Sequence, residues 1–347
     1  MQPCSLLSVA TAVPPHAIAQ EEAKEIGRRA FRRKNLFERL APVFDNAAIA
    51  KRHLVAPAEW YEQPHGWAER NQVYLDASEA LFEEAARAAI DRAGLQPADI
   101  HGVVTVSTTG IATPSLEARV GPRLGLRSDV RRVPIFGLGC AGGVSGLALA
   151  ARLAVSEPAT NWLFVTVETC SISIRLDSDD PAAVVATALF GDGAAAAVAR
   201  AGEGGLASVR GSAEKLWPDT LGIMGWRVED PGLGVVFDRA IPPFIEAELG
   251  QAVADMCAQL KIAREDIGRF CCHPGGVKVI DAIETALRLP QGELNLEREV
   301  LRDFGNMSAP TVMFVLERLL ERGLPDRALM TAFGPGFTCS GLMLEAA

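Results

Sequence analysis

Hydrophobic and polar positions follow two different periods along the chain, and these periods predict helices and strands in turn. Residues 76–94 carry apolar side chains at helical spacing and end at Gly94, a residue type that commonly follows the last turn of a helix. Residues 100–109 (IHGVVTVSTT) form a continuous, largely β-branched run, which is typical of a buried strand. The alternation of strand and helix continues to about residue 200.

The second part of the chain repeats this style after a segment, 201–232, that is rich in glycine, proline and charge. We expect the junction there, between an N-terminal half, residues 1–205, and a C-terminal half, residues 206–347. Helices are predicted near 243–261, at about 276–288 and after the turn DFGNMSAP, with strands at GRFCCHPGG and at the C-terminus. Strands alternating with helices in both halves predict an α/β fold made of two similar units.

Composition narrows the class of protein. The chain has 347 residues, of which 49% are hydrophobic and 22% charged, so it can bury a large core and is not disordered. The net charge of −9 argues against a nucleic-acid-binding surface. We expect no membrane span and no secretory signal. The seven cysteines are an odd number and lie mostly in apolar runs, so we expect no disulfides. We therefore expect a cytoplasmic location.

A cysteine lies on the predicted turn between a strand and a helix, in the segment GLGCAGG. Helix N-termini present free N–H groups and a positive dipole end, so we expect this position to lower the pKa of Cys140. The flanking glycines allow a substrate to approach closely. The alternative interpretation is a small structural residue of the core.

The same segment also matches the glycine pattern of dinucleotide-binding proteins. Residues 137–142 read G-x-G-x-x-G, and Glu168 at the end of the next strand could contact a ribose. A lone match of this kind is a weak signal, and it leaves the second half of the chain unexplained. An NAD(P)-binding oxidoreductase is therefore kept as an alternative function.

Two polar residues of the second half lie where α/β folds project catalytic side chains. His273 ends an apolar strand before a Pro-Gly-Gly turn, and Asn306 precedes the start of a helix. A hydrogen-bonded structural histidine and a turn or N-cap asparagine are the alternatives. A metal site at Cys271, Cys272 and His273 is disfavoured, because adjacent strand residues point to opposite faces and no further Cys/His pair completes the set.

Together, a cysteine, a histidine and an asparagine on turns suggest a site that handles thioesters. His273 can hold the thiolate of Cys140 as an ion pair. His273 and Asn306 can jointly hydrogen-bond a thioester oxygen, which stabilises the enolate formed when a malonyl group loses carbon dioxide.

Five separated motifs occur in one order along the chain. They are GCAGG around Cys140, ALFGDGAAA at 188–196, HPGG at His273, GNMSAPTVMFVLE at Asn306 and FGPGFT at 333–338. With these motifs the chain, from KRHL at 51–54 to its C-terminus, resembles the type III polyketide synthases, the chalcone and stilbene synthase-like family of thiolase fold. The resemblance implies a layered αβαβα fold and a homodimer acting on acyl-CoA and malonyl-CoA.

The resemblance also implies a role for each matching residue. Cys140 would take the starter acyl group from coenzyme A, and His273 and Asn306 would act in decarboxylation and condensation. The enzyme would be an acyltransferase that needs no metal, redox cofactor or carrier protein. Further residues implied to contact the substrate are the gatekeeper Phe190, Ser308, and Gly334 of the loop 333–336.

Several positions depart from the plant members of the family. Val235 aligns with a second gatekeeper phenylalanine, and a smaller residue there would widen the cavity. Cys170 and Ser173 occupy positions of cavity-lining threonines, and this segment resembles bacterial members that make alkylresorcinols or alkylpyrones from long acyl starters. Among the basic residues near the coenzyme A phosphates, Arg39 matches one position, whereas others hold Pro42 and Asn46.

Two further alternatives remain beside the oxidoreductase. A ketoacyl synthase III-like condensing enzyme shares the cysteine, histidine and asparagine, but would depend on a carrier protein. The HPGG and FGPG elements argue against it. A non-enzymatic scaffold of the same fold is disfavoured because all three catalytic positions are intact.

Overall fold

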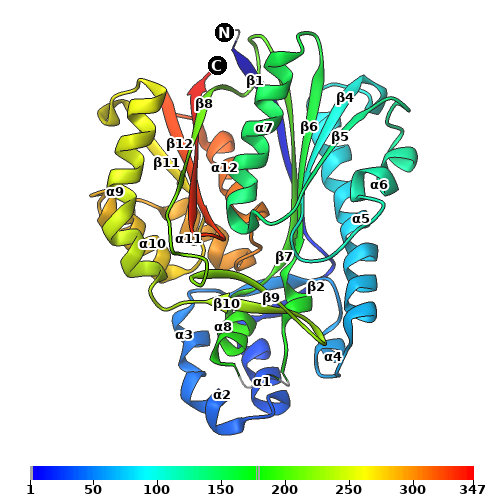
Figure 1. The fold of residues 1–347 in the computed structure, drawn as a ribbon, viewed down its shortest axis with the longest axis vertical. Coiled ribbons are helices and arrows are strands. Elements are labelled where there is room, and N and C mark those ends of the chain that lie inside the picture. Colours follow the sequence, from blue (N-terminus) through cyan, green and yellow to red (C-terminus); the bar gives the residue numbers. More distant parts are fainter. Residues whose placement is uncertain (1–2, 177, 179) are drawn as a thin grey trace.

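Within residues 3–176, 178 and 180–347, which the computed structural model describes, nine strands form one mixed sheet that helices cover on both faces (Figure 1). The strand order is β11-β12-β13-β8-β1-β7-β6-β4-β5, and two two-stranded sheets, β2–β3 and β9–β10, are separate from this sheet.

The bounds of the elements are as follows. The strands are β1 Cys4–Ala12, β2 His16–Ala19, β3 Lys51–Leu54, β4 Ile100–Val106, β5 Arg131–Ile135, β6 Asn161–Thr169, β7 Asp192–Ala201, β8 Ala207–Leu216, β9 Met224–Glu229, β10 Gly232–Phe237, β11 Arg269–Cys272, β12 Arg327–Gly334 and β13 Thr338–Ala346. The α-helices are α1 Gln20–Ala30, α2 Lys34–Leu40, α3 Pro42–Asn46, α4 Ala58–Tyr61, α5 Trp67–Arg92, α6 Leu116–Leu124, α7 Gly142–Ser156, α8 Pro181–Leu189, α9 Ile241–Leu260, α10 Val277–Ala286, α11 Asn295–Phe304 and α12 Pro310–Arg322. Short 3-10 helices are η1 Pro97–Asp99, η2 Gly139–Ala141, η3 Cys170–Ser173 and η4 Arg264–Asp266.

The first strand, β1, joins the two sides of the sheet. It pairs antiparallel with β7 on one edge and with β8 on the other. Its sequence CSLLSVATA is apolar or small throughout and mostly buried, as expected of a strand covered on both faces. Strands β7, β6, β4 and β5 extend from one edge, and β8, β13, β12 and β11 extend from the other.

Helices α7 and α12 form a central layer that touches both sides. Helix α7 contacts β4, β6 and β7 as well as β8, β12 and β13, and α12 likewise contacts strands of both sides. Helix α5 covers the outer face of β1, β6 and β7, whereas α9 covers β8 and β13 (Figure 1). The arrangement is the five-layered αβαβα order that the sequence predicted.

The adjacent cysteines of β11 show how a strand divides two layers. Cys271 is buried in the core around α7 and α12, and Cys272 is buried in the core beneath α9 and α10. The two side chains therefore point to opposite faces, as the strand period requires. The expectation that these adjacent residues point to opposite faces is confirmed.

The segment 201–232, where the junction between the two halves is expected, contains a complete strand. Residues 207–216 are not a linker but the full-length strand β8, which pairs with β13 and β1. Its sequence ASVRGSAEKL mixes charges with small residues because the strand is only partly buried. The proposed division at 205/206 falls in the turn before β8 and stays a prediction.

One segment, Gly139–Ser156, is apolar and long enough to cross a membrane. It is 72% buried inside the protein, because it comprises the central helix α7 and the turn before it. Its hydrophobicity is that of a helix covered by sheets on both sides.

Candidate active site

The segment around Cys140 has the predicted form of a turn followed by a helix. Strand β5 ends at Ile135, and the single turn η2, Gly139–Ala141, leads directly into α7. All seven cysteines are free, and Cys140 alone keeps partial exposure while the other six are buried. This makes Cys140 the most accessible thiol of the chain.

A chain of short contacts links Cys140 to residues of the second half. The Cys140 thiol donates to the Ser308 hydroxyl at 3.5 Å, and the Ser308 backbone N–H donates to Asn306 Oδ1 at 2.8 Å. Asn306 Nδ2 donates to the Gly275 carbonyl at 3.1 Å. The Gly275 N–H in turn donates to the carbonyl of His273 at 3.1 Å. The structure therefore brings the predicted cysteine, histidine and asparagine together at one site.

His273 lies directly beyond β11, where it continues the pairing with β12 through its N–H and the Thr331 carbonyl at 2.8 Å. It is 3% exposed, and neither ring nitrogen has a hydrogen-bond partner among the described residues. Burial lowers the pKa of His273 to about 3, so the ring is neutral. A buried imidazole with both nitrogens free can donate to a substrate oxygen and accept a proton.

The prediction that the helix N-terminus lowers the pKa of Cys140 is wrong for this structure. Burial raises the pKa of the thiol to about 12, and the charge of Glu168 acts in the same direction. The hydrogen bond to Ser308 opposes this rise but does not overcome it. Burial is the largest cause of the rise, because it removes water that would otherwise stabilise the thiolate.

Glu168 is fully buried at the end of β6, behind the reactive turn. Its carboxylate accepts the Thr108 N–H at 2.9 Å and the Thr109 hydroxyl at 2.8 Å. Burial raises the pKa of Glu168 to about 7. A carboxylate bonded in this way is not available for a ribose hydroxyl, so the dinucleotide interpretation of residues 137–142 loses its acidic partner.

A small apolar cluster contains three of the residues that were expected to contact the substrate. Phe190, Cys170 and Val235 are buried together. Trp226 and Phe237 pack edge-on against the Phe190 ring, with centroid distances of 6.0 and 5.5 Å. Sequence reasoning missed Trp226, although it lies directly opposite Val235 in the β9–β10 pairing.

The predicted loop 333–336 is in part the end of β12, which runs to Gly334, and this end lies against the reactive turn. A Cβ placed on Gly334 would lie 2.4 Å from the Leu138 carbonyl and 2.7 Å from Ala141 Cβ, so no larger residue fits without movement. Gly334 therefore serves the close packing of this loop against the segment that carries Cys140.

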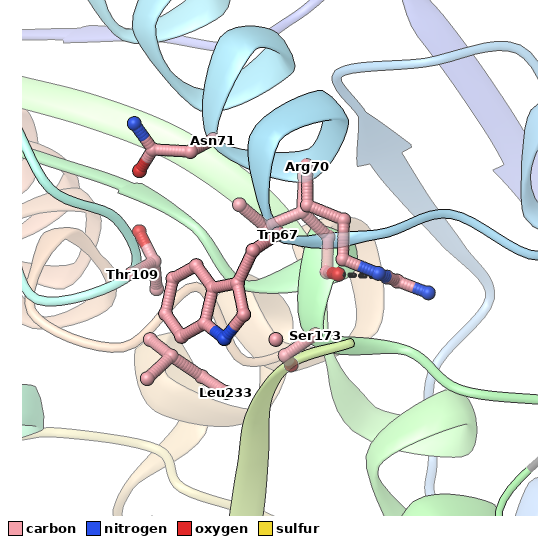
Figure 2. A pocket seen from close by; sticks show the side chains of 8 residues that line it. Trp67, Arg70, Asn71, Thr109, Ser173 and Leu233 are labelled. Carbon is pink, nitrogen blue, oxygen red and sulfur yellow. Dashed lines mark hydrogen bonds between the residues drawn. The ribbon is translucent and has the colours of Figure 1, made fainter. Parts of the chain in front are cut away.

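Ser173, the remaining predicted cavity residue, lines a small hollow that is partly open to solvent. Figure 2 shows the indole of Trp67 with Thr109, Leu233 and Ser173 around this hollow. The Ser173 hydroxyl donates to the Cys170 carbonyl at 2.7 Å. Thr109, which also lines this hollow, donates a hydrogen bond to Glu168, so the hollow adjoins that buried carboxylate.

Arg39 is the predicted residue that the structure does not tie to this site. It lies exposed near the end of α2, in the helical cap formed by α1, α2, α3 and α8 (Figure 1). Among the described residues, no group of three or more histidine, cysteine or acidic side chains is arranged to hold a metal ion.

The layered fold, with a cysteine from one half facing a histidine and an asparagine from the other, is that of the thiolase-like condensing enzymes. The profile of chalcone and stilbene synthases matches this chain twice, the N-terminal domain at residues 2–203 and the C-terminal domain at residues 208–347. The chain therefore belongs to the chalcone and stilbene synthase family, the type III polyketide synthases, and is an acyltransferase of that class.

Individual relatives agree with this assignment. A 1,3,6,8-tetrahydroxynaphthalene synthase from Streptomyces peucetius subsp. caesius is 38% identical over 361 residues, which cover 98% of this chain and 93% of the relative. The crystal structure of 1,3,6,8-tetrahydroxynaphthalene synthase from Streptomyces coelicolor A3(2) has a TM-score of 0.93 at 28% identity, with 99% of both chains covered. CsyB complexed with CoA-SH has a TM-score of 0.92 at 25% identity, covering 99% of this chain and 100% of that chain.

Proposed function

We propose that Cys140 is the nucleophile of this polyketide synthase and that coenzyme A thioesters are its substrates. The thiol sulfur attacks the acyl carbonyl, a new thioester forms, and coenzyme A leaves as its thiol. The unpartnered ring of His273 accepts the thiol proton, and the resulting ion pair stabilises two charges that are each costly when buried alone. Support for coenzyme A comes from the related CsyB, whose structure contains CoA-SH.

In the extension step, His273 and Asn306 act on the malonyl thioester. Loss of carbon dioxide leaves the electron pair on the thioester as an enolate, whose oxygen needs hydrogen-bond donors. A neutral His273 offers an N–H, and Asn306 Nδ2 has a second hydrogen beyond the one given to Gly275. The enolate carbon then attacks the acyl group on Cys140, and the extended chain passes to coenzyme A.

The observation that carries these assignments is the contact chain from Cys140 through Ser308 and Asn306 to the His273 loop. The test is incubation with labelled malonyl-CoA and a panel of acyl-CoAs, followed by mass analysis of protein and product. Cys140→Ala should abolish the acyl-enzyme and the product, whereas Cys170→Ala should retain acyl loading. Full turnover by Cys140→Ala would move the nucleophile elsewhere, with Cys170 as the first candidate.

For the product, we infer a polyhydroxylated aromatic made from malonyl-CoA alone. The indole of Trp226 fills space beside Phe190 and Val235, which disfavours a long acyl chain there. The 38% identical relative is a 1,3,6,8-tetrahydroxynaphthalene synthase. The alkylresorcinol or alkylpyrone expected from long starters is the alternative, supported by the resemblance of the segment around Cys170 and Ser173 to bacterial members of that kind. An aromatic product formed from malonyl-CoA without any added starter would support the polyhydroxylated aromatic. A strict need for a fatty acyl-CoA would support the alkylresorcinol or alkylpyrone.

We also expect a homodimer in the cytoplasm. Phe136 and Ile111 are 62% and 56% exposed, and both lie in loops that leave the carboxyl ends of the adjacent strands β5 and β4. Strand β5 is the free edge of the sheet on that side. Exposed aromatic and aliphatic side chains beside an open edge favour a second copy of the chain there. Light scattering on the wild type and on Phe136→Ser tests this, and a wild-type monomer would refute it.

Arg39 stays a proposed contact for the coenzyme A phosphates, because its cationic head group is exposed. Arg39→Ala should raise the KM for malonyl-CoA without changing kcat. Arg127→Ala is the control, since that exposed arginine pairs with Asp129. An unchanged KM would remove Arg39 from the substrate site.

A further inference from the structure

We propose that Arg52 is a positioning residue that fixes the backbone carrying Phe190 and Asn306. Through that backbone it controls decarboxylation of the malonyl group, whereas acyl loading at Cys140 does not depend on it. The proposal rests on the function proposed above for Asn306.

Arg52 is a buried arginine that serves backbone carbonyls instead of a carboxylate. It lies on β3, is 1% exposed, and donates from Nη1 to the carbonyls of Thr187 at 2.5 Å and Phe190 at 3.2 Å. These carbonyls come from the end of α8, where a helix leaves its last carbonyls without internal donors. Burial lowers the pKa of Arg52 to about 10, which shows how strongly the site opposes this charge.

The charge that offsets Arg52 is Asp192, the first residue of β7. Its carboxylate accepts the N–H groups of Ser171 at 2.7 Å and Val55 at 2.8 Å, together with the Ser171 hydroxyl. Val55 directly follows β3. The strand that carries Arg52 is therefore tied to Asp192 at one end, and through Arg52 to the backbone of Phe190.

The segment that Arg52 holds is paired with the backbone of Asn306. The Asn306 N–H donates to the Leu189 carbonyl at 2.8 Å, and the Gly191 N–H donates to the Asn306 carbonyl at 3.0 Å. Gly305 has a φ of 69°, and a Cβ there would lie 2.9 Å from both Cγ and Cδ of Arg52. The guanidinium of Arg52 thus donates to the carbonyl of Phe190 on one side of this backbone pairing. Its aliphatic side chain lies against Gly305, next to Asn306, on the other side.

The Cys140 turn is held by different elements. Its backbone is set by η2 and α7 and by the close packing of Gly334 against Leu138 and Ala141. A change at Arg52 therefore acts directly on the Asn306 backbone, whereas it reaches the Cys140 thiol by the longer route through Ser308. This separation predicts that decarboxylation falls while the reactivity of Cys140 is retained. A general loss of structure would reduce both.

The test compares Arg52→Lys and Arg52→Met with Lys51→Met, an exposed neighbour on the same strand. Arg52→Lys keeps the charge but loses the guanidinium whose Nη1 donates to both carbonyls. We expect kcat for malonyl-CoA decarboxylation to fall about tenfold or more, with KM within about twofold. The rate of Cys140 alkylation by iodoacetamide should stay within about twofold of wild type. Lys51→Met should change neither reaction.

Parallel losses of alkylation and decarboxylation in folded Arg52→Lys, or no loss at all, would overturn the proposal. Should Arg52→Met fail to fold, Gly305→Ala disturbs the same bridge from its other side and should give the same split. Hydrogen exchange adds a readout that needs no catalysis, because the amides of Gly191 and Asn306 should exchange faster in Arg52→Lys. If the wild type shows no decarboxylase activity, the proposed function is refuted. If the amides of Gly191 and Asn306 exchange at the wild-type rate in Arg52→Lys, the positioning role of Arg52 is refuted.

Discussion

The Cys140 thiol lies 3.5 Å from the Ser308 hydroxyl, although 168 positions separate the two residues in the chain. This hydrogen bond lowers the pKa of a thiol that burial otherwise raises. Ser308→Ala should therefore slow alkylation of Cys140 by iodoacetamide about threefold to tenfold at pH 8. Ser173→Ala is the control, because that hydroxyl bonds the Cys170 carbonyl instead. A rate equal to wild type in Ser308→Ala would show that the contact does not act on the thiolate.

The amide of Asn306 is predicted to serve decarboxylation and not acyl loading. Asn306→Asp keeps the size of the side chain but sets an oxygen against the Gly275 carbonyl in place of the Nδ2 donor. Removing a donor from a developing oxyanion costs about 100-fold or more in rate, so malonyl-CoA decarboxylation should fall by that much. Alkylation of Cys140 should persist, and Asn295→Asp, on the exposed start of α11, should match wild type in both assays. Equal losses of both activities would contradict the assignment.

Glu168 should make the protein less stable as the pH rises from about 4.5 to 7. Its pKa is raised to about 7 in the folded state, so the folded protein binds a proton that the unfolded chain has lost in this range. Glu168→Gln should reduce the decrease in unfolding free energy between pH 5 and pH 8 by up to about 3 kcal/mol. Urea unfolding at the two pH values measures this. The same decrease in wild type and variant would mean that Glu168 titrates normally.

Position 334, at the end of β12, should be intolerant of any side chain. A methyl group there would lie 2.4 Å from the Leu138 carbonyl, so Gly334→Ala must shift the loop or the reactive turn. Overpacking of this kind costs about 1–3 kcal/mol and should also slow acyl loading. Gly222→Ala is the matched control, because a Cβ there meets nothing within 4 Å. Thermal unfolding and acyl-enzyme formation, measured on both variants, decide the point, and equal behaviour of the two would refute it.

Trp226 should limit the length of the acyl group that the site accepts. Trp226→Ala removes the indole that packs against Phe190, and so opens space beside Val235. We expect the variant to use longer acyl-CoA starters than wild type, as measured by product masses from a series of chain lengths. Val228→Ala provides the comparison on the same strand, since Val228 is 77% exposed. An identical starter profile in Trp226→Ala would place the length limit elsewhere.

Much of the fold could be predicted because the pattern along the chain is local. The turn at Gly94, the helix after Cys140 and the strand before His273 all follow from periodicity and from glycine at element ends. The motifs pointed to three residues that the structure links in one chain of hydrogen bonds, and each of them lies at a strand or helix terminus. Strand β8 was taken for part of a junction because a half-buried strand with charges lacks a continuous apolar run.

The rest of the site depends on contacts between distant segments. Trp226 became visible only through the register that sets it opposite Val235. Arg52 lies within the recognised KRHL motif, but no local pattern shows that its head group bonds the end of α8. The pKa of Cys140 was misjudged because helix position can be read from sequence whereas depth of burial cannot.

The place of β1 in the sheet bears on how the protein is made. This strand is synthesised long before both of its neighbours, one of which begins at Asp192 and the other at Ala207. Until those residues have been synthesised, an apolar strand remains without partners on either edge. Nascent chains that stop before β8 should therefore need a chaperone to stay unaggregated, and no truncated product of that length can carry a complete site.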